Sequence, residues 1–385
     1  MSSILILGIG QLVGAREEAA PLLRGKALAE LPSISDAFLW IEDGLIRDFG
    51  PMEQAPGRAD LVIDARGGWI LPGWVDSHTH LVFAGSREQE FVHRIHGLSY
   101  QEISQRGGGI LNSALRLGET AEEELFDQTW QRLEEVMAKG TVGIEIKSGY
   151  GLSKESELKI LRVARKVKEN APIPVKTTFL GCHAIPEPFR SLGDREGYLS
   201  LMLDEVLPEI AGEGLADYID VFCEKVAFSP EETDRILTAG ERYGLKGKIH
   251  TNQFYSLGGI ETALRHQALS VDHLEVVNEE EIQLLAKNDM IATLLPSAPF
   301  FLNDHYPSGR SLVDAGVPIA LASDYNPGST PSGNMPFVLS LACIKCRLLP
   351  EEALQAATVN GAYALELEKE LGSIERGKRG SVLLT

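Results

Sequence analysis

The apolar and polar positions of the chain change their pattern near residue 71. From there, short apolar runs alternate with longer stretches of helical periodicity, which is typical of βα units and a parallel sheet. Eight of the apolar runs are predicted strands: Trp74–Phe83, Thr141–Lys147, Val175–Leu180, Tyr218–Cys223, Gly247–Asn252, Ser270–Val276, Ile291–Leu295 and Pro318–Ser323. Helical patterns stand between most of them, for example Ala121–Lys139, Lys154–Glu169, Pro230–Tyr243 and Gly259–His266. Eight parallel strands with intervening helices predict a (β/α)8 TIM-type barrel, which we assign to residues 71–365.

Residues 1–70 consist of shorter apolar runs between Gly, Pro and Asp turns. The predicted strands are Ile4–Leu7, Ala37–Ile41, Leu45–Phe49 and Leu61–Asp64, and together they predict a small β-sandwich-like domain. Gly8, Gly10 and Gly14 follow the first run, but their spacing does not match a dinucleotide-binding loop. Glu351–Leu365 is a predicted helix, and residues 366–385 resemble a turn that enters a strand. We expect that strand either to complete the small domain or to be cut short by truncation.

Polar residues gather where the predicted barrel strands end. Active sites of (β/α)8 barrels lie at the carboxyl ends of the strands, so these residues are the candidates for chemistry. They are His78, His80 and Arg87 after the first strand, Tyr150 after the second, His183 after the third, Glu224 and Lys225 after the fourth, His250 and Gln253 at the fifth, Asp272 to Glu275 at the sixth, and Asp324 to Ser329 after the eighth. Burying so many ionisable groups is costly unless they are ligated or paired.

The residue types at these ends predict a metal centre. His78 and His80 are separated by one residue, so they face the same way if the strand continues through them. With His250 and Asp324 they supply three imidazoles and a carboxylate, a set that suits zinc or iron. A catalytic metal lowers the pKa of bound water, and a neighbouring base must then take the proton. His273 and Asp324 are the candidates for that base.

Two positions remain open at this stage. Lys225, if it pointed inward, would be able to bridge two metal ions after carbamylation, but strand alternation does not decide between the face of Asp220 and Glu224 and the face of Lys225. His93, His96, His266 and His305 lie in helical or loop patterns, and we expect no direct role for them.

Composition narrows the classes of partner. Lys and Arg number 36 against 55 Asp and Glu, giving a net charge of −19, which argues against nucleic-acid binding. We find no apolar run of membrane-spanning length and no convincing signal peptide. The four cysteines do not form a disulfide framework, and the Cys343/Cys346 pair is expected to be structural. These features predict a cytoplasmic protein.

Several motifs are similar to those of one enzyme family. The chain resembles the amidohydrolase superfamily from His78-Thr79-His80 to Asp324, and within it the imidazolonepropionase family. The motifs that carry the closer resemblance are Pro72 to Arg87, Gly107 to Leu111, Lys147 to Leu152, Thr178 to Ala184 and Ser323 to Gly328.

The resemblance implies a reaction and a set of functional residues. The reaction is hydrolysis of 4-imidazolone-5-propanoate to N-formimidoyl-L-glutamate, in histidine degradation. The resemblance implies one Zn²⁺ or Fe²⁺/Fe³⁺ ion per subunit, held by His78, His80, His250 and Asp324. It implies substrate contacts at Arg87, Tyr150, His183 and Gln253, and product contacts at Asn326, Gly328 and Ser329. A homodimer is the assembly it implies.

Two other functions are possible from the residues. A deaminase or cyclic amidase of the same superfamily would act on a neutral ring, whereas the set Arg87, Tyr150 and Asn326 favours an anionic small-molecule substrate, because a guanidinium pairs with a carboxylate in bidentate fashion. A catalytically inactive metal-binding scaffold is the third reading, and the complete set of ligands and base argues against it.

Overall fold

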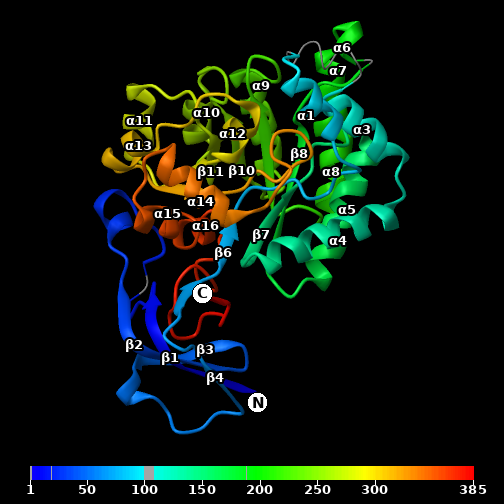
Figure 1. The fold of residues 1–385 in the computed structure, drawn as a ribbon. Helices are drawn as coiled ribbons and strands as arrows, with labels where there is room; N and C mark the ends of the chain where they lie inside the picture. The colour runs from blue at the N-terminus through cyan, green and yellow to red at the C-terminus, as the bar shows by residue number, and fades with distance from the viewer. Residues whose placement is uncertain (1, 19, 99–107, 188) are drawn as a thin grey trace.

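A closed parallel barrel dominates the protein. The structure, a computed structural model, describes residues 2–18, 20–98, 108–187 and 189–385. Its larger sheet has eight strands in the order β13-β12-β11-β10-β9-β8-β7-β6, all paired in parallel (Figure 1). Their bounds are β6 Trp74–Asp76, β7 Thr141–Lys147, β8 Val175–Cys182, β9 Tyr218–Cys223, β10 Lys246–Thr251, β11 Ser270–His273, β12 Ile291–Leu294 and β13 Ile319–Leu321. The predicted (β/α)8 fold is confirmed.

The barrel closes between β6 and β13 through the segments that follow these strands and contain His78, His80 and Asp324. β6 ends at Asp76 rather than at Phe83, so the first predicted strand was too long. Beyond it, Thr79 forms a lone parallel bridge with Tyr325, and the His80 N–H donates to the Tyr325 carbonyl at 2.8 Å. The Asp76 carboxylate accepts from the Ser323 N–H at 2.9 Å and from its hydroxyl at 2.6 Å. Side-chain and isolated backbone bonds replace a regular ladder here, which explains the short strand.

Helices cover the outside of the barrel. Their bounds are α1 Glu88–Ile95, α3 Ile110–Glu119, α4 Glu122–Ala138, α5 Lys154–Asn170, α6 Phe189–Leu192, α7 Arg195–Ser200, α8 Leu207–Glu213, α9 Pro230–Glu241, α10 Gly259–Arg265, α11 Glu279–Ala286, α12 Ser297–Leu302, α13 Gly309–Asp314, α14 Met335–Ile344, α15 Pro350–Ala356 and α16 Val359–Tyr363. Capping boxes at Ser229 and Asn278 fix the starts of α9 and α11, because each side chain satisfies a backbone N–H that the helix leaves unpaired. None of the helices in the described ranges combines the length and apolarity that crossing a bilayer needs.

The helix predicted over residues 351–365 is broken in two. α15 ends at Ala356, and α16 starts after Thr358, whose φ of −122° and ψ of −80° are not helical. The Asn360 amide donates to the carbonyls of Leu23 and Ile319 at 2.8 and 2.7 Å. The break therefore accompanies a contact between α16 and the barrel, in which Asn360 donates to the carbonyl of Ile319 in β13.

A second, mixed sheet stands below the barrel, and both chain ends lie on that side (Figure 1). Its six strands are β1 Ser3–Val13, β2 Ser33–Glu42, β3 Leu45–Pro51, β4 Leu61–Asp64, β5 Trp69–Pro72 and β14 Val382–Leu384. The domain expected as sandwich-like is this one sheet, in which β1 pairs with both β4 and β5, and β14 pairs antiparallel with β5. β1 runs through the glycines that follow Leu7, with a register shift between Ile6 and Ile9, where Gly8 has a φ of +62°. A separate apolar cluster, which includes Ile9, Leu39 and Ile70, is buried within it.

We expect Gly10→Ala to destabilise this sheet. A Cβ at residue 10 would overlap the carbonyl oxygen of Gly67, and backbone cannot give way as a side chain does. Overpacking of this kind costs about 1–3 kcal/mol, to be measured as a lowered urea midpoint. Gly57→Ala is the matched control, because nothing lies within 4 Å of its Cβ position. Equal midpoints for the two variants would contradict the packing at Gly10.

Candidate active site

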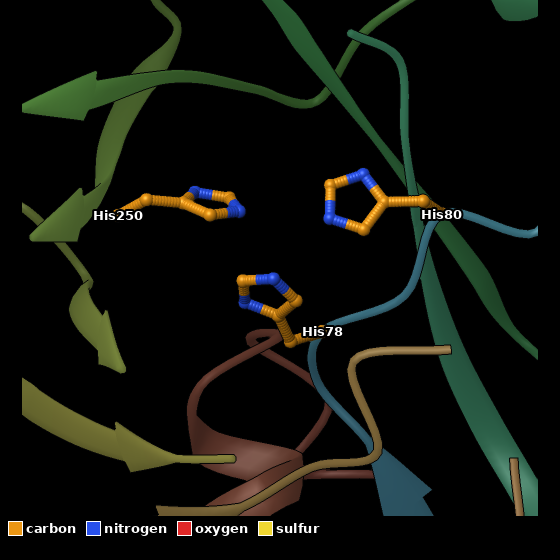
Figure 2. A group of neighbouring side chains, drawn as sticks. All are labelled: His78, His80 and His250. Atoms are coloured by element: carbon orange, nitrogen blue, oxygen red, sulfur yellow. The ribbon is translucent and has the colours of Figure 1, made fainter. Parts of the chain in front are cut away.

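Three buried histidines converge at the carboxyl ends of the barrel strands. His78 and His80 follow β6, and His250 lies in β10. One ligand atom from each lies within 4.8 Å of the others, and all three residues are buried. Figure 2 shows the three rings turned toward a common point. The grouping of these three residues agrees with the sequence prediction.

Asp324 lies beside this group, after β13. Its Oδ1 is 3.5 Å from His78 Nε2 and 3.6 Å from His80 Nε2. Its Oδ2 accepts a hydrogen bond of 3.1 Å from the Ser329 hydroxyl. Burial raises the pKa of Asp324 to about 6, against a smaller opposing effect of His273 and the hydrogen bonds that the carboxylate receives. A positive ion in contact with the carboxylate would lower that pKa again.

The donor set fits a metal ion. His78 Nε2 and both nitrogens of His250 are buried without a hydrogen-bond partner among the described residues, which is costly for a polar atom. The pKa values of His78, His80 and His250 are all lowered well below the ordinary value, with burial as the largest cause. These histidines are therefore neutral, which is the form that binds metals. A bound cation would give the unpartnered nitrogens of His78 and His250 a partner.

The opposite edges of the rings face acceptors. His78 Nδ1 lies 2.7 Å from Asp272 Oδ2, and His80 Nδ1 lies 3.4 Å from the Ser148 carbonyl. His250 Nδ1 lies 3.0 Å from Asp220 Oδ2, although the angle falls outside hydrogen-bond geometry. An acceptor at Nδ1 keeps the proton there and leaves Nε2 for the metal.

His273 lies at the end of β11 and beside the histidine group. Its ring centroid is 5.4 Å from that of His250 and 5.8 Å from that of His78. Burial alone would lower its pKa, but the carboxylates of Glu275, Asp324 and Asp272 outweigh burial, so the pKa is raised. Its φ of +90° is rare for a residue with a side chain, and such backbone strain clusters at functional sites. His273 is thus a group that can hold a proton next to the centre.

Tyr150 and His183 line the same space. The Tyr150 ring packs edge-on against His80 and His183, with centroids 5.4 Å apart in both cases. His183 stacks on His80 at 5.6 Å, and its Nδ1 lies 3.1 Å from the Gly149 carbonyl. Burial lowers the pKa of His183 to about 4, so its ring is neutral at pH 7. The two residues predicted to contact the substrate are therefore adjacent to a predicted ligand.

Arg87 begins the segment that leads into α1 and is held by a carboxylate. Its Nε donates to Glu90 Oε1 at 2.9 Å, and Glu90 also accepts from the Gly109 N–H at 2.8 Å. The guanidinium lies against Gly328, where a Cβ would overlap Nη1. Gly328 belongs to the loop that carries Asp324, so Arg87 contacts the loop that also positions this candidate ligand. Gly107, part of the same predicted motif region as Gly109, falls outside the described residues.

Asn326 and Ser329 organise the loop after β13. The Asn326 Nδ2 donates to the Asp324 carbonyl at 2.7 Å and to the Ser329 hydroxyl at 2.8 Å. Its Oδ1 accepts from the N–H groups of Gly328 and Ser329 at 2.7 and 2.8 Å. The Asn326 amide is thus occupied within its own loop, where it supports Asp324 through Ser329. Its predicted contact with product stays a prediction.

At the end of β9, the structure shows which of Glu224 and Lys225 is buried, a question that strand alternation left open. Glu224 is buried, and its Oε2 accepts from the N–H groups of Phe254 and Tyr255 at 2.9 and 3.2 Å. Lys225 is exposed, with its ammonium over the Tyr255 ring, so it does not bridge metal ions. Gln253 is half-buried in the loop after β10.

The histidines with no expected role lie elsewhere. His305 is 90% exposed, and His266 pairs with Asp234 and Glu241 on the outer face of the barrel.

Sequence reasoning placed Asp272 among the candidate residues but assigned no supporting role to the charged residues behind the three histidines. Asp220, Asp272, Lys147 and Glu145 are fully or almost fully buried, and two of them contact ligand histidines. A signal was present in the sequence: charged residues recur at alternating positions of otherwise apolar strands, as in Glu145 and Lys147 or Lys248 and His250. Glu90, the partner of Arg87, had no such signal.

Comparisons with known proteins agree with this site. The model of the amidohydrolase family matches residues 69–385. The imidazolonepropionase of Christiangramia forsetii is 52% identical over 384 residues, covering 100% of this chain and 93% of that protein. The imidazolonepropionase of Geobacillus thermodenitrificans is 42% identical over 392 residues, covering 100% of this chain and 92% of that protein.

Solved structures share the fold at low identity. A triazine hydrolase variant has a TM-score of 0.74 at 18% identity, covering 99% of this chain and 86% of that one. An adenosine deaminase from Xanthomonas campestris with bound zinc has a TM-score of 0.72 at 17% identity, covering 100% of this chain and 84% of that one.

The barrel, the histidine group and the family match define the class: the chain belongs to the amidohydrolase family, whose members are metal-dependent hydrolases. Within that family, identity over the full chain assigns it to the imidazolonepropionases.

Proposed function

We propose that this protein hydrolyses the ring of 4-imidazolone-5-propanoate to N-formimidoyl-L-glutamate, with one zinc or iron ion at His78, His80, His250 and Asp324. The observation that carries the proposal is the neutral three-histidine group with Arg87 on the adjacent loop. A centre for water activation and a cation for a carboxylate are the two features that this substrate requires. The full-length identity to imidazolonepropionases supports the same substrate.

The metal, when bound, lowers the pKa of water and polarises the ring carbonyl. The chain supplies the other parts of the reaction. His78, His80 and His250, all buried, would hold the ion, and Asp324 would add a negatively charged ligand. Ser329 orients the Asp324 carboxylate through its hydrogen bond to Oδ2.

We assign the proton transfers to His273. Its Nδ1 lies 3.4 Å from Glu275 Oε1, which leaves Nε2 as the atom that exchanges the proton. The raised pKa of His273 lets the imidazolium form when the attacking water loses its proton. The same proton can then pass to the ring nitrogen that leaves, so one residue serves as base and then as acid.

Arg87 binds the propionate in this proposal. Glu90 holds the guanidinium in a defined orientation, and a planar fork matches a carboxylate better than a point charge does. Tyr150 and His183 are the proposed contacts of the ring, because both lie against His80. Gln253 is the proposed partner of a ring nitrogen from the loop after β10.

The substrate class is tested by comparing anionic and neutral rings. Purified protein with zinc or iron is offered 4-imidazolone-5-propanoate, the amide of the same propionate, hydantoin, dihydrouracil and adenosine. We expect fast turnover of the propanoate alone. Preferential turnover of adenosine or of a neutral cyclic amide would replace this proposal with a deaminase or cyclic-amidase function.

We expect Arg87→Met to raise KM with little change in kcat. Removing a hydrogen bond to a charged group costs about 1.5–3 kcal/mol, which corresponds to a KM roughly 10- to 100-fold higher. Arg87→Lys keeps the charge but loses the fork, so its KM should fall between those of Arg87→Met and the unchanged protein. An unchanged KM in Arg87→Met would remove Arg87 from the substrate site.

A further inference from the structure

Five charged side chains lie in the barrel interior next to the histidine group. They are Glu145 and Lys147 on β7, Asp220 on β9, Lys248 on β10 and Asp272 on β11. The side chains of all five are 0% exposed. Transferring charges out of water is expensive, and apolar residues of similar size usually serve stability as well or better. Two members of this cluster contact His78 and His250, so the cluster has a role at the proposed metal site beyond stabilising the fold.

Lys147 connects the two carboxylates that contact ligand histidines. Its Nζ lies 2.8 Å from Asp220 Oδ2 and 3.6 Å from Asp272 Oδ2. The same two oxygen atoms face the imidazoles: Asp220 Oδ2 lies 3.0 Å from His250 Nδ1, and Asp272 Oδ2 lies 2.7 Å from His78 Nδ1. One ammonium group therefore sits between the supports of two of the three histidines.

The arrangement is also favourable electrostatically. Burial lowers the pKa of Lys147, but Asp220, Glu145 and Asp272 outweigh burial and raise it, so the side chain stays charged. Without that charge, two buried carboxylates would repel each other across the space that Lys147 fills, and each would turn toward another donor. Movement of Asp272 would break its hydrogen bond to His78, and movement of Asp220 would remove the negative charge that lies 3.0 Å from His250 Nδ1.

We propose that Lys147 is a positioning residue of the metal centre, which orients His78 and His250 through Asp272 and Asp220. This inference rests on the proposed metal centre but not on the identity of the substrate. Lys147 touches neither the metal ligands nor the substrate in this role. Its effect is to keep the Nε2 atoms of the two rings directed at a common point.

Lys248 provides a matched control. It is as buried as Lys147, and its Nζ bonds Glu145 Oε2 at 2.8 Å and the Ser77 carbonyl at 3.0 Å. Within the described residues it forms no ion pair with Asp220 or Asp272. Lys248→Met therefore removes a buried charge from the same cluster without removing the bridge between the two carboxylates.

The test measures binding of cobalt(II) alone, with no substrate present. Metal-free Lys147→Met and Lys248→Met are titrated with cobalt(II) against a competing chelator, and the visible d–d absorption of the bound ion is recorded. Loss of a carboxylate behind a metal ligand typically weakens affinity by about 10- to 100-fold. We expect a loss of up to that size, with altered d–d bands, for Lys147→Met, because both carboxylates lose the ammonium that lies between them. For Lys248→Met we expect an affinity within about 3-fold of the unchanged protein and unaltered bands, since the Lys147 bridge between the two carboxylates remains.

The melting temperatures of the metal-free variants separate positioning from general destabilisation. Unchanged affinity and bands in Lys147→Met would overturn the proposal, and so would equal losses of affinity in both variants. If Lys147→Met does not fold, Asp272→Asn and Glu145→Gln repeat the comparison, because Asp272 bonds His78, whereas the Glu145 carboxylate bonds the two lysines and Thr178 and no histidine among the described residues.

Two outcomes in the unchanged protein separate this inference from the proposed function. Tight cobalt binding without turnover of the imidazolone would contradict the substrate and leave the role of Lys147 intact. Failure of the unchanged protein to bind cobalt would overturn both.

Discussion

His250→Ala is expected to lose both its bound metal and its activity. His250 is the one member of the three-histidine group that comes from β10, whereas His78 and His80 follow β6, so its loss removes the donor atom that this part of the barrel contributes. Losing a partner behind a ligand already costs about 10- to 100-fold in affinity or activity, so loss of the ligand itself should lower kcat/KM by at least about 10³-fold. Metal content by atomic absorption and turnover are measured on the same preparation.

His305→Ala is the control for this loss. His305 is 90% exposed and pairs with its neighbour Asp304, so the variant should keep metal and rate. If His250→Ala retained a full complement of metal and turned over substrate, the assignment of the centre would be wrong. The melting temperature of His250→Ala is measured as well, because removing a buried imidazole leaves a cavity that lowers stability whether or not the residue binds metal.

The second large effect is expected at His273. His273→Asn should retain metal but lower kcat by about 10²- to 10⁴-fold, the usual contribution of a general acid–base group. KM should change little, because His273 exchanges protons and does not bind the propionate in this account. Retention of metal separates this variant from His250→Ala and shows that the loss lies in proton transfer.

His266→Asn is the matched control for His273→Asn. His266 is also a histidine with carboxylate partners, Asp234 and Glu241, but it lies on the outer face of the barrel. We expect its kcat to be unchanged. A His273→Asn variant with nearly full kcat would exclude His273 as the proton carrier and leave Asp324 as the remaining candidate.

The sequence predicted the grouping of the four candidate ligands because two independent signals agreed at each of them. His78, His80, His250 and Asp324 have side chains that bind metals, and each stands near the end of an apolar run that predicts a strand. The carboxyl ends of parallel strands meet at one face of a barrel, so residues distant in sequence are brought together by the fold alone. The structure places Asp324 3.5 Å from His78, across 246 residues, as this rule requires.

The supporting residues were not predictable in the same way. Alternation tells which residues of a strand share a face, but the pairing of Lys147 with Asp220 and Asp272 depends on the stagger between strands. The inward direction of Glu224 and the exposure of Lys225 also depend on where β9 ends, which periodicity does not locate to within one residue. Buried ion pairs between strands therefore appeared only with the three-dimensional register.

Two errors in the predicted secondary structure, at β6 and at residues 351–365, both arise from tertiary hydrogen bonds. β6 was predicted to reach Phe83, since the run from Trp74 is apolar, yet its ladder stops at Asp76, whose carboxylate accepts from the Ser323 N–H and hydroxyl. The helix over residues 351–365 was predicted as continuous because its composition is helical. It breaks at Thr358 because Asn360 binds backbone carbonyls of Leu23 and Ile319. Tertiary hydrogen bonds overrode local preference at both places.

In the proposed reaction, the imidazolone ring is opened at a single metal ion held by these residues. The most direct test adds zinc or iron(II) stepwise to metal-free protein and follows loss of the ring absorbance of freshly made 4-imidazolone-5-propanoate, with bound metal measured on each sample. We expect the rate to rise with bound metal and to level off at about one equivalent per chain, because the proposed catalytic site is mononuclear. Full metal binding without ring loss, or ring loss in the metal-free protein, would contradict it.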